Sequence, residues 1–320
     1  MRNDRITFVQ FIWTMLICSI YSVVFTKCEP SGGNLIISGC IIFINLIIYY
    51  LYQDKPTKLT KAVLAVYFSY IILICSVRFT DYMSAELGYG PVWLIVIILL
   101  VFIFFCSLKG IEPIIRAGAI ILPFLLGAVI YIAVCCFGFI KFDISLAVDT
   151  NMIFYLILLF PGACYIWMKD NIIPSKNYSK YISALILLGI IVLFMFLSDN
   201  RNGEFPYQRI TEIAYIDVFR GADCMLLELF SVSGLFITAI PTVVMFNNSD
   251  NKYIHKGIYL SAIGILILIS EYSIYVKSFV QNEFLVLGVF TVVLLTELIE
   301  IIKAFINLRG NKPVWMNKNS

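Results

Sequence analysis

The chain has 320 residues, of which 61% are hydrophobic and 13% charged, and its net charge at pH 7 is +3. Soluble domains carry about 25% charged residues, so this composition excludes an ordinary soluble enzyme. A single histidine, His255, and nine cysteines without a CxxC pair argue against a zinc hydrolase, a histidine-based triad and a redox or metal site. We therefore expect no enzyme activity, no metal and no cofactor.

Ten apolar runs follow one another along the chain, and each is close to the ~20 residues that a spanning helix needs. They cover residues 6–26, 34–52, 60–80, 91–108, 113–140, 151–169, 179–198, 219–246, 256–277 and 282–306. The sequence therefore predicts an all-α integral membrane protein, with residues 1–320 forming a single transmembrane domain of ten helices. The first run is of spanning length and lacks a cleavage site, so we expect no cleavable signal peptide.

The lysines and arginines predict how these helices are oriented, because they are enriched in cytoplasmic connections. With an inside N-terminus and strict alternation, 16 of the 23 fall inside and 7 outside. The outer ones are Lys27, Arg78, Lys141, Arg201, Arg209, Arg220 and Lys277. Both termini are therefore predicted to be cytoplasmic. The basic residues follow this topology and are not interleaved with aromatic residues, so no nucleic-acid partner is expected.

Small and polar residues gather in the outer half of the first run. Cys18, Ser19 and Ser22 stand there among apolar neighbours. Two interpretations are open. These side chains could line a ligand-binding cavity, or their hydroxyls could hydrogen bond back to their own helix.

The sixth run contains the clearest helix breaker, Phe160-Pro161-Gly162. Proline removes an intrahelical hydrogen bond, and glycine frees the backbone beside it. Transporters use interrupted helices as solute sites, whereas a packed proline kink is the alternative. Tyr165 and Trp167 follow and offer a polar edge and a flat wall, so Phe160, Pro161, Gly162 and Tyr165 are candidate ligand-binding residues.

Charged residues within the runs are the second signal, because ionisable groups are costly in lipid. Arg78, Asp223 and Glu228 are the intramembrane charges that we select as candidates, and Glu271 and Glu297 lie late in their runs. The alternative is simple pairing, since Arg220 and Asp223 are three residues apart on one helical face.

The segment Lys109–Pro123 (KGIEPIIRAGAIILP) resembles a conserved stretch of the endospore germination permease family, the B subunits of spore germinant receptors. Val77–Met83 (VRFTDYM) is similar to a second motif of that family, at the end of its third helix. Phe205-Pro206 and Ile216–Phe219 with Asp223 resemble its outer loop and eighth helix. Ala119 stands where the family often has an acid.

This resemblance implies a permease-like bundle of two inverted five-helix repeats, as in the amino acid/polyamine/organocation superfamily. It also implies A-type and C-type partner subunits, a spore inner membrane location, and sensing of a small nutrient such as an amino acid. In that fold the first and sixth helices are unwound at the ligand. The first run here has neither glycine nor proline, unlike the family. An ion-coupled amino-acid transporter and a scaffolding membrane subunit are the alternatives.

Overall fold

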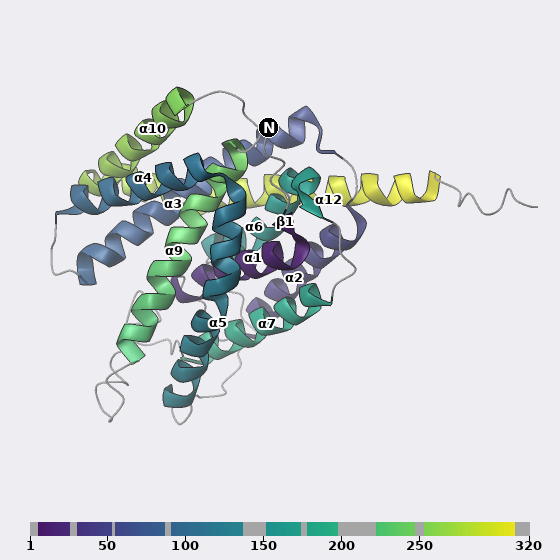
Figure 1. Cartoon of the computed structure of the whole chain (residues 1–320), viewed down its shortest axis with the longest axis horizontal. Helices are drawn as coiled ribbons and strands as arrows, with labels where there is room; N and C mark the ends of the chain where they lie inside the picture. The colour runs from purple at the N-terminus through teal and green to yellow at the C-terminus, as the bar shows by residue number, and fades with distance from the viewer. Residues whose placement is uncertain are drawn as a thin grey trace, which may run out of the picture.

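A computed structural model describes residues 6–25, 31–52, 55–86, 91–136, 152–173, 178–197, 222–246 and 253–310. Almost all of these residues are helical (Figure 1). The helices are α1 (Phe8–Phe25), α2 (Gly32–Leu51), α3 (Lys58–Glu86), α4 (Val92–Lys109), α5 (Ile111–Cys136), α6 (Met152–Met168), α7 (Ser179–Leu197), α9 (Ala222–Phe246), α10 (Tyr253–Tyr272), α11 (Ile274–Val280) and α12 (Glu283–Gly310). The predicted outer connection 199–218 lies outside the described residues.

Each of the ten predicted runs contains a long helix, so the apolar pattern located the helices correctly. The bounds differ most in the ninth run, 256–277, which was predicted as one helix. The structure divides it into α10 and the short α11, with Ser273 between them in an extended conformation at φ −122° and ψ 107°. An apolar run does not reveal such a local change of backbone, because both helices keep the same composition.

Six segments among the described residues are long and apolar enough to cross a membrane. They are Gly32–Leu51, Lys58–Ser84, Val92–Lys109, Ile111–Val134, Met152–Asn171 and Ile274–Asn307. The exposed faces agree with this, because α4 presents Trp93, Ile98 and Phe105 outward and α12 presents Phe284, Val292 and Ile302. Soluble proteins rarely expose apolar faces of this extent. The fold is therefore helical and compatible with a multi-pass membrane protein.

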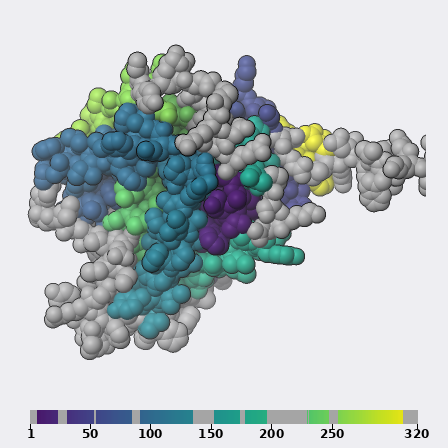
Figure 2. Space-filling model, in the orientation of Figure 1, coloured from purple at the N-terminus to yellow at the C-terminus, as the bar shows by residue number. Residues whose placement is uncertain are grey.

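Helices α1 and α6 lie at the centre of the bundle and contact each other. Every residue of α6 from Ile153 to Ile166 is buried. Only part of α1 reaches the surface seen in Figure 2, beside α5. Apolar residues on all faces of a helix are typical of a fully enclosed position, and this explains why these two helices are central.

The other helices pack around this pair in a regular set of contacts. Helix α1 packs on α5, α7 and α9, and α6 packs on α12, α2 and α3. The outer contacts include α2 with α7, α3 with α9, α4 with α10, α4 with α9, α3 with α10, α5 with α9 and α3 with α12.

Helix ends that strict alternation puts on one side do meet. Strand β1 (Ile6–Thr7) precedes α1 and pairs in parallel with β2 (Ile172–Ile173), which follows α6. Lys55 forms a 3.3 Å ion pair with Asp170. At the opposite ends, Lys277 forms an ion pair with Asp81. These contacts agree with the sidedness of the alternating arrangement.

Candidate functional site

Helix α6 passes through Pro161-Gly162 without interruption, so the predicted break in this helix is not present. Neighbouring helices supply hydrogen bonds to its backbone near the proline. Asn45 Nδ2 on α2 donates to the Leu158 carbonyl at 2.8 Å. The Tyr67 hydroxyl on α3 donates to the Leu156 carbonyl at 2.7 Å. Side chains of α2 and α3 thus add hydrogen bonds to carbonyls in the turn before Pro161.

Gly162 forms a notch that lets two other helices approach α6. A Cβ atom at this position would overlap Asn45 Oδ1 and would lie 2.9 Å from Ile48 Cδ1 and 3.0 Å from Glu297 Oε1. Real Cβ atoms do not have contacts this close, so only glycine fits without a shift of its neighbours. The notch therefore brings an amide oxygen of α2 and a carboxylate oxygen of α12 to one point on α6.

Glu297 is fully buried near the middle of α12. Neither of its carboxylate oxygens makes a full hydrogen bond to a described group, although the backbone N–H of Ala163 lies beside it. The Asn45 Oδ1 atom at the notch likewise has no hydrogen-bond partner among the described groups. The notch thus gathers oxygen acceptors without matching donors, which is an arrangement that attracts a proton or another positively charged donor.

A small cavity of about 40 Å³ adjoins the notch between α1, α2, α6 and α7. Its wall includes Ser19, Asn45, Tyr49, Pro161, Lys180 and Ser183. A water molecule needs roughly 10–15 Å³ by this measure, so the space holds about three. An amino acid needs more room than this space offers.

The candidate residues of α1 are all buried, but only Ser19 borders the cavity. Its hydroxyl donates to the Met15 carbonyl at 3.0 Å, and the Ser22 hydroxyl donates to the Ser19 carbonyl at 2.7 Å. Of the two interpretations of this cluster, hydrogen bonding back to the same helix therefore holds for both serines. Cys18 is buried in the apolar core.

The candidate residues of α6 are placed in different surroundings. Pro161 borders the cavity, and Gly162 forms the notch on the side that faces α2 and α12. Phe160 is a core residue that packs against the Phe68 ring at 5.8 Å. Tyr165 packs on the Tyr49 ring at 5.1 Å, and its hydroxyl accepts a hydrogen bond from Lys169.

Of the intramembrane charges selected from the sequence, Arg78 is described in full, and it does not join this site. Arg78 is largely buried on α3, near Tyr21 and Asp81. Asp81 in turn pairs with Lys277, whose Nζ also lies 3.6 Å from a carboxylate oxygen of Glu271. Asp223 and Glu228 belong to α9, but their side chains lie outside the described part of the structure.

Sequence reasoning missed Asn45 and did not connect Glu297 with the sixth helix. A signal was available in the sequence, because Asn45 is a lone polar side chain inside an apolar run. Such a side chain is costly in lipid, so its presence there indicates a structural or functional role. No group of three or more His, Cys, Asp or Glu side chains that could hold a metal ion occurs among the described residues.

Neither a comparison with models of known protein families nor one with curated proteins found a match to this chain. The function must therefore be argued from the residues and their geometry.

Proposed function

We propose that this chain is the membrane-embedded B-type subunit of a spore germinant receptor. In this proposal it senses a small nutrient, such as an amino acid, within a permease-like bundle of two inverted five-helix repeats. It works with A-type and C-type subunits in the spore inner membrane and has both termini in the cytoplasm. The Lys109–Pro123 stretch is the sequence feature that supports this family, and the packing of the helices supports the repeat.

The packing observation is a symmetry in the set of helix contacts, and it supports the inverted-repeat part of the proposal. The ten long helices are α1 to α7, α9, α10 and α12, and the symmetry appears when the first five are exchanged with the last five. The contact of α1 with α5 becomes that of α6 with α12, and α2 with α6 becomes α7 with α1. Likewise α5 with α9 becomes α12 with α3, and α4 with α9 becomes α10 with α3.

Four further contacts, α1 with α6, α2 with α7, α3 with α9 and α4 with α10, are unchanged by the exchange. Two repeats that pack against each other in this way are expected to give such a pattern. Because each half has an odd number of helices, alternation makes the second half run opposite to the first. Substrate sites in folds of this kind lie at the interface of the repeats, which is where α1, α6 and the cavity are found.

The size of the cavity predicts that sensing requires movement of the helices around it. It is too small for an amino acid, so a nutrient binds only if α1, α2, α6 and α7 separate. Such a rearrangement changes the outer surface of the bundle, where partner subunits would detect it. A ligand shifts the equilibrium between a closed and an open form only by the difference between its binding free energies for the two forms.

Deletion of the gene, followed by germination assays against a panel of amino acids, tests this proposal. We expect loss of the response to one nutrient or a small group of nutrients, with normal germination by other routes. An unchanged response to every amino acid would contradict the receptor role.

Gly162→Ala should weaken the response, whereas the matched control Gly189→Ala on α7, where a Cβ meets no atom within 4 Å, should not.

The second candidate is an ion-coupled amino-acid transporter, which the buried Glu297 favours. Carboxyl groups within spans commonly mark ion or proton pathways. Uptake of labelled amino acid into proteoliposomes, driven by a proton or sodium gradient and abolished by Glu297→Gln, would favour transport. Nutrient response without uptake would favour the receptor.

A further inference from the structure

Two oxygen acceptors converge on the Gly162 notch from different helices. The side chains of Asn45 and Glu297 both come within 3.0 Å of the point where a Cβ atom of residue 162 would stand. The Asn45 amide cannot turn a donor toward this point at no cost, because its Nδ2 already donates to the Leu158 carbonyl at 2.8 Å. Both oxygens therefore face the notch without a hydrogen-bond donor among the described groups.

Among the described residues, the groups that face Glu297 from the helices packed around it do not supply a positive charge. They are Tyr49 on α2, Tyr67 on α3 and Cys164 on α6. The Tyr67 hydroxyl is engaged with the Leu156 carbonyl. On α12 itself the nearest charged groups are Glu300 and Lys303, which pair with each other at 2.9 Å.

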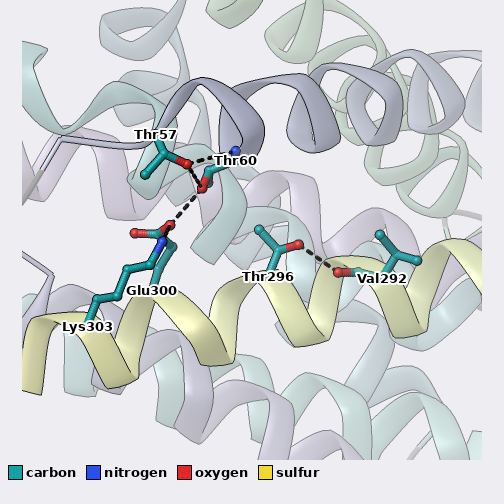
Figure 3. Close-up of polar contacts among 6 residues, drawn as sticks. All are labelled: Thr57, Thr60, Val292, Thr296, Glu300 and Lys303. Carbon is teal, nitrogen blue, oxygen red and sulfur yellow. Dashed lines mark hydrogen bonds and ion pairs between the residues drawn. The ribbon is translucent and has the colours of Figure 1, made fainter.

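Glu300 lies three residues after Glu297 on the same helix and is also buried, so it provides an internal comparison (Figure 3). Its Oε1 atom accepts a hydrogen bond from the Thr60 hydroxyl at 2.6 Å and pairs with Lys303 Nζ at 2.9 Å. A carboxylate with a donor and a cation is stabilised in its charged form. Glu297 has the same chemistry and similar burial but neither kind of side-chain partner.

We propose that Glu297 is a proton-binding site that joins α2, α6 and α12 at the Gly162 notch. The proton removes a buried charge and supplies the missing donor, so that the Glu297 carboxyl donates to Asn45 Oδ1. A metal ion fits less well, because two side chains provide few ligands and Glu297 does not border the cavity.

The proton site has a mechanical consequence. When Glu297 loses its proton, an uncompensated negative charge is left in the apolar interior and faces the Asn45 oxygen across the notch, and only the backbone N–H of Ala163 lies beside it as a donor. Proton occupancy therefore sets how tightly α12 and α2 hold α6. This inference goes beyond the proposed sensing role and does not depend on which nutrient is bound, or on whether one is.

Infrared spectroscopy of the purified full-length chain in lipid nanodiscs tests the site directly. A protonated carboxyl absorbs apart from a carboxylate. We expect a protonated band at neutral pH that disappears at alkaline pH and is missing in Glu297→Gln. The matched control Glu300→Gln should retain the band, because the Glu300 carboxylate has a hydroxyl donor and a lysine as partners. A wild-type spectrum without the band, or a Glu297→Gln spectrum that keeps it, would overturn the proposal.

Carbodiimide labelling provides a second measurement that needs no variant, since these reagents modify protonated carboxyl groups in apolar surroundings. Mass spectrometry of the labelled wild-type chain should find the modification at Glu297 and not at Glu300, with an extent that falls as pH rises. Sodium chloride is compared with choline chloride at constant pH and ionic strength. Equal labelling of Glu297 in both salts supports a proton site. Weaker labelling in sodium chloride than in choline chloride would overturn the proposal, because sodium would then occupy the site.

Discussion

Helices α1 and α6 occupy equivalent central positions but meet their backbone requirements differently. In α1 the Ser19 and Ser22 hydroxyls donate to carbonyls of the same helix. In α6 the carbonyls of Leu156 and Leu158 accept hydrogen bonds from side chains of α3 and α2. Carbonyls of α1 thus accept from side chains of the same helix, whereas carbonyls of α6 accept from side chains of its neighbours.

This difference identifies the part of the centre that is easier to rearrange. Breaking the contacts of α6 with α2 or α3 changes the hydrogen bonds beside Pro161 without unfolding a helix. A comparable change in α1 has to disrupt its own turns. We therefore expect substitutions at the Gly162 notch to have large effects and equivalent changes in α1 to have small ones.

The largest effect is expected for Gly162→Leu, which places a bulky side chain against Asn45, Ile48 and Glu297. Overpacking of this kind costs about 1–3 kcal/mol or more, so the melting temperature in detergent should fall clearly. Insertion into the membrane should remain normal, because the substitution increases hydrophobicity. The control is Gly189→Leu on α7, and equal melting temperatures for the two variants would contradict the notch.

Asn45→Ala should have the next largest effect. It removes the amide that donates to the Leu158 carbonyl and that shares the notch with the Glu297 carboxyl. An unsatisfied buried polar group costs about 1–3 kcal/mol, which thermal or denaturant unfolding would detect. Asn45→Asp is the informative companion, since it keeps the size but loses the donor and adds an acid beside Glu297. An aspartate variant as stable as the wild type would show that the Asn45 donor is unimportant.

Tyr67→Phe should have a smaller effect, because it removes a single neutral hydrogen bond to α6. The expected loss of stability is about 1 kcal/mol. Tyr275→Phe is a suitable control, since the Tyr275 side chain is 85% exposed. If the two variants unfold at the same temperature, the Tyr67 hydroxyl does not support α6.

The positions of the helices could be predicted because each one repeats the same physical signal, a long apolar run. The Pro161-Gly162 pair was recognised for a similar reason, since breakers are rare in such runs. The contact of Gly162 with Asn45 and Glu297 could not be predicted, because apolar runs do not specify which helix faces which. The continuity of α6 at Pro161 could not be predicted either, because a proline in a spanning helix is compatible with a break and with an unbroken helix.

The smallest effect is expected for Ser19→Ala in α1, and it completes the comparison. The Met15 carbonyl that Ser19 contacts already belongs to a regular helix, so stability should change by less than ~0.5 kcal/mol. Ser38→Ala in α2 is the matched control, because the buried Ser38 hydroxyl likewise donates to its own helix, at the Asn34 carbonyl.

The two serines differ in one respect, which is that Ser19 borders the cavity and Ser38 does not. If the cavity admits the nutrient, Ser19→Ala should shift the nutrient concentration for half-maximal germination while Ser38→Ala leaves it unchanged. A loss of stability in Ser19→Ala would instead mean that α1 also depends on its side chains, and the contrast with α6 would disappear. Germination responses and melting temperatures measured on the same pair of variants separate these outcomes.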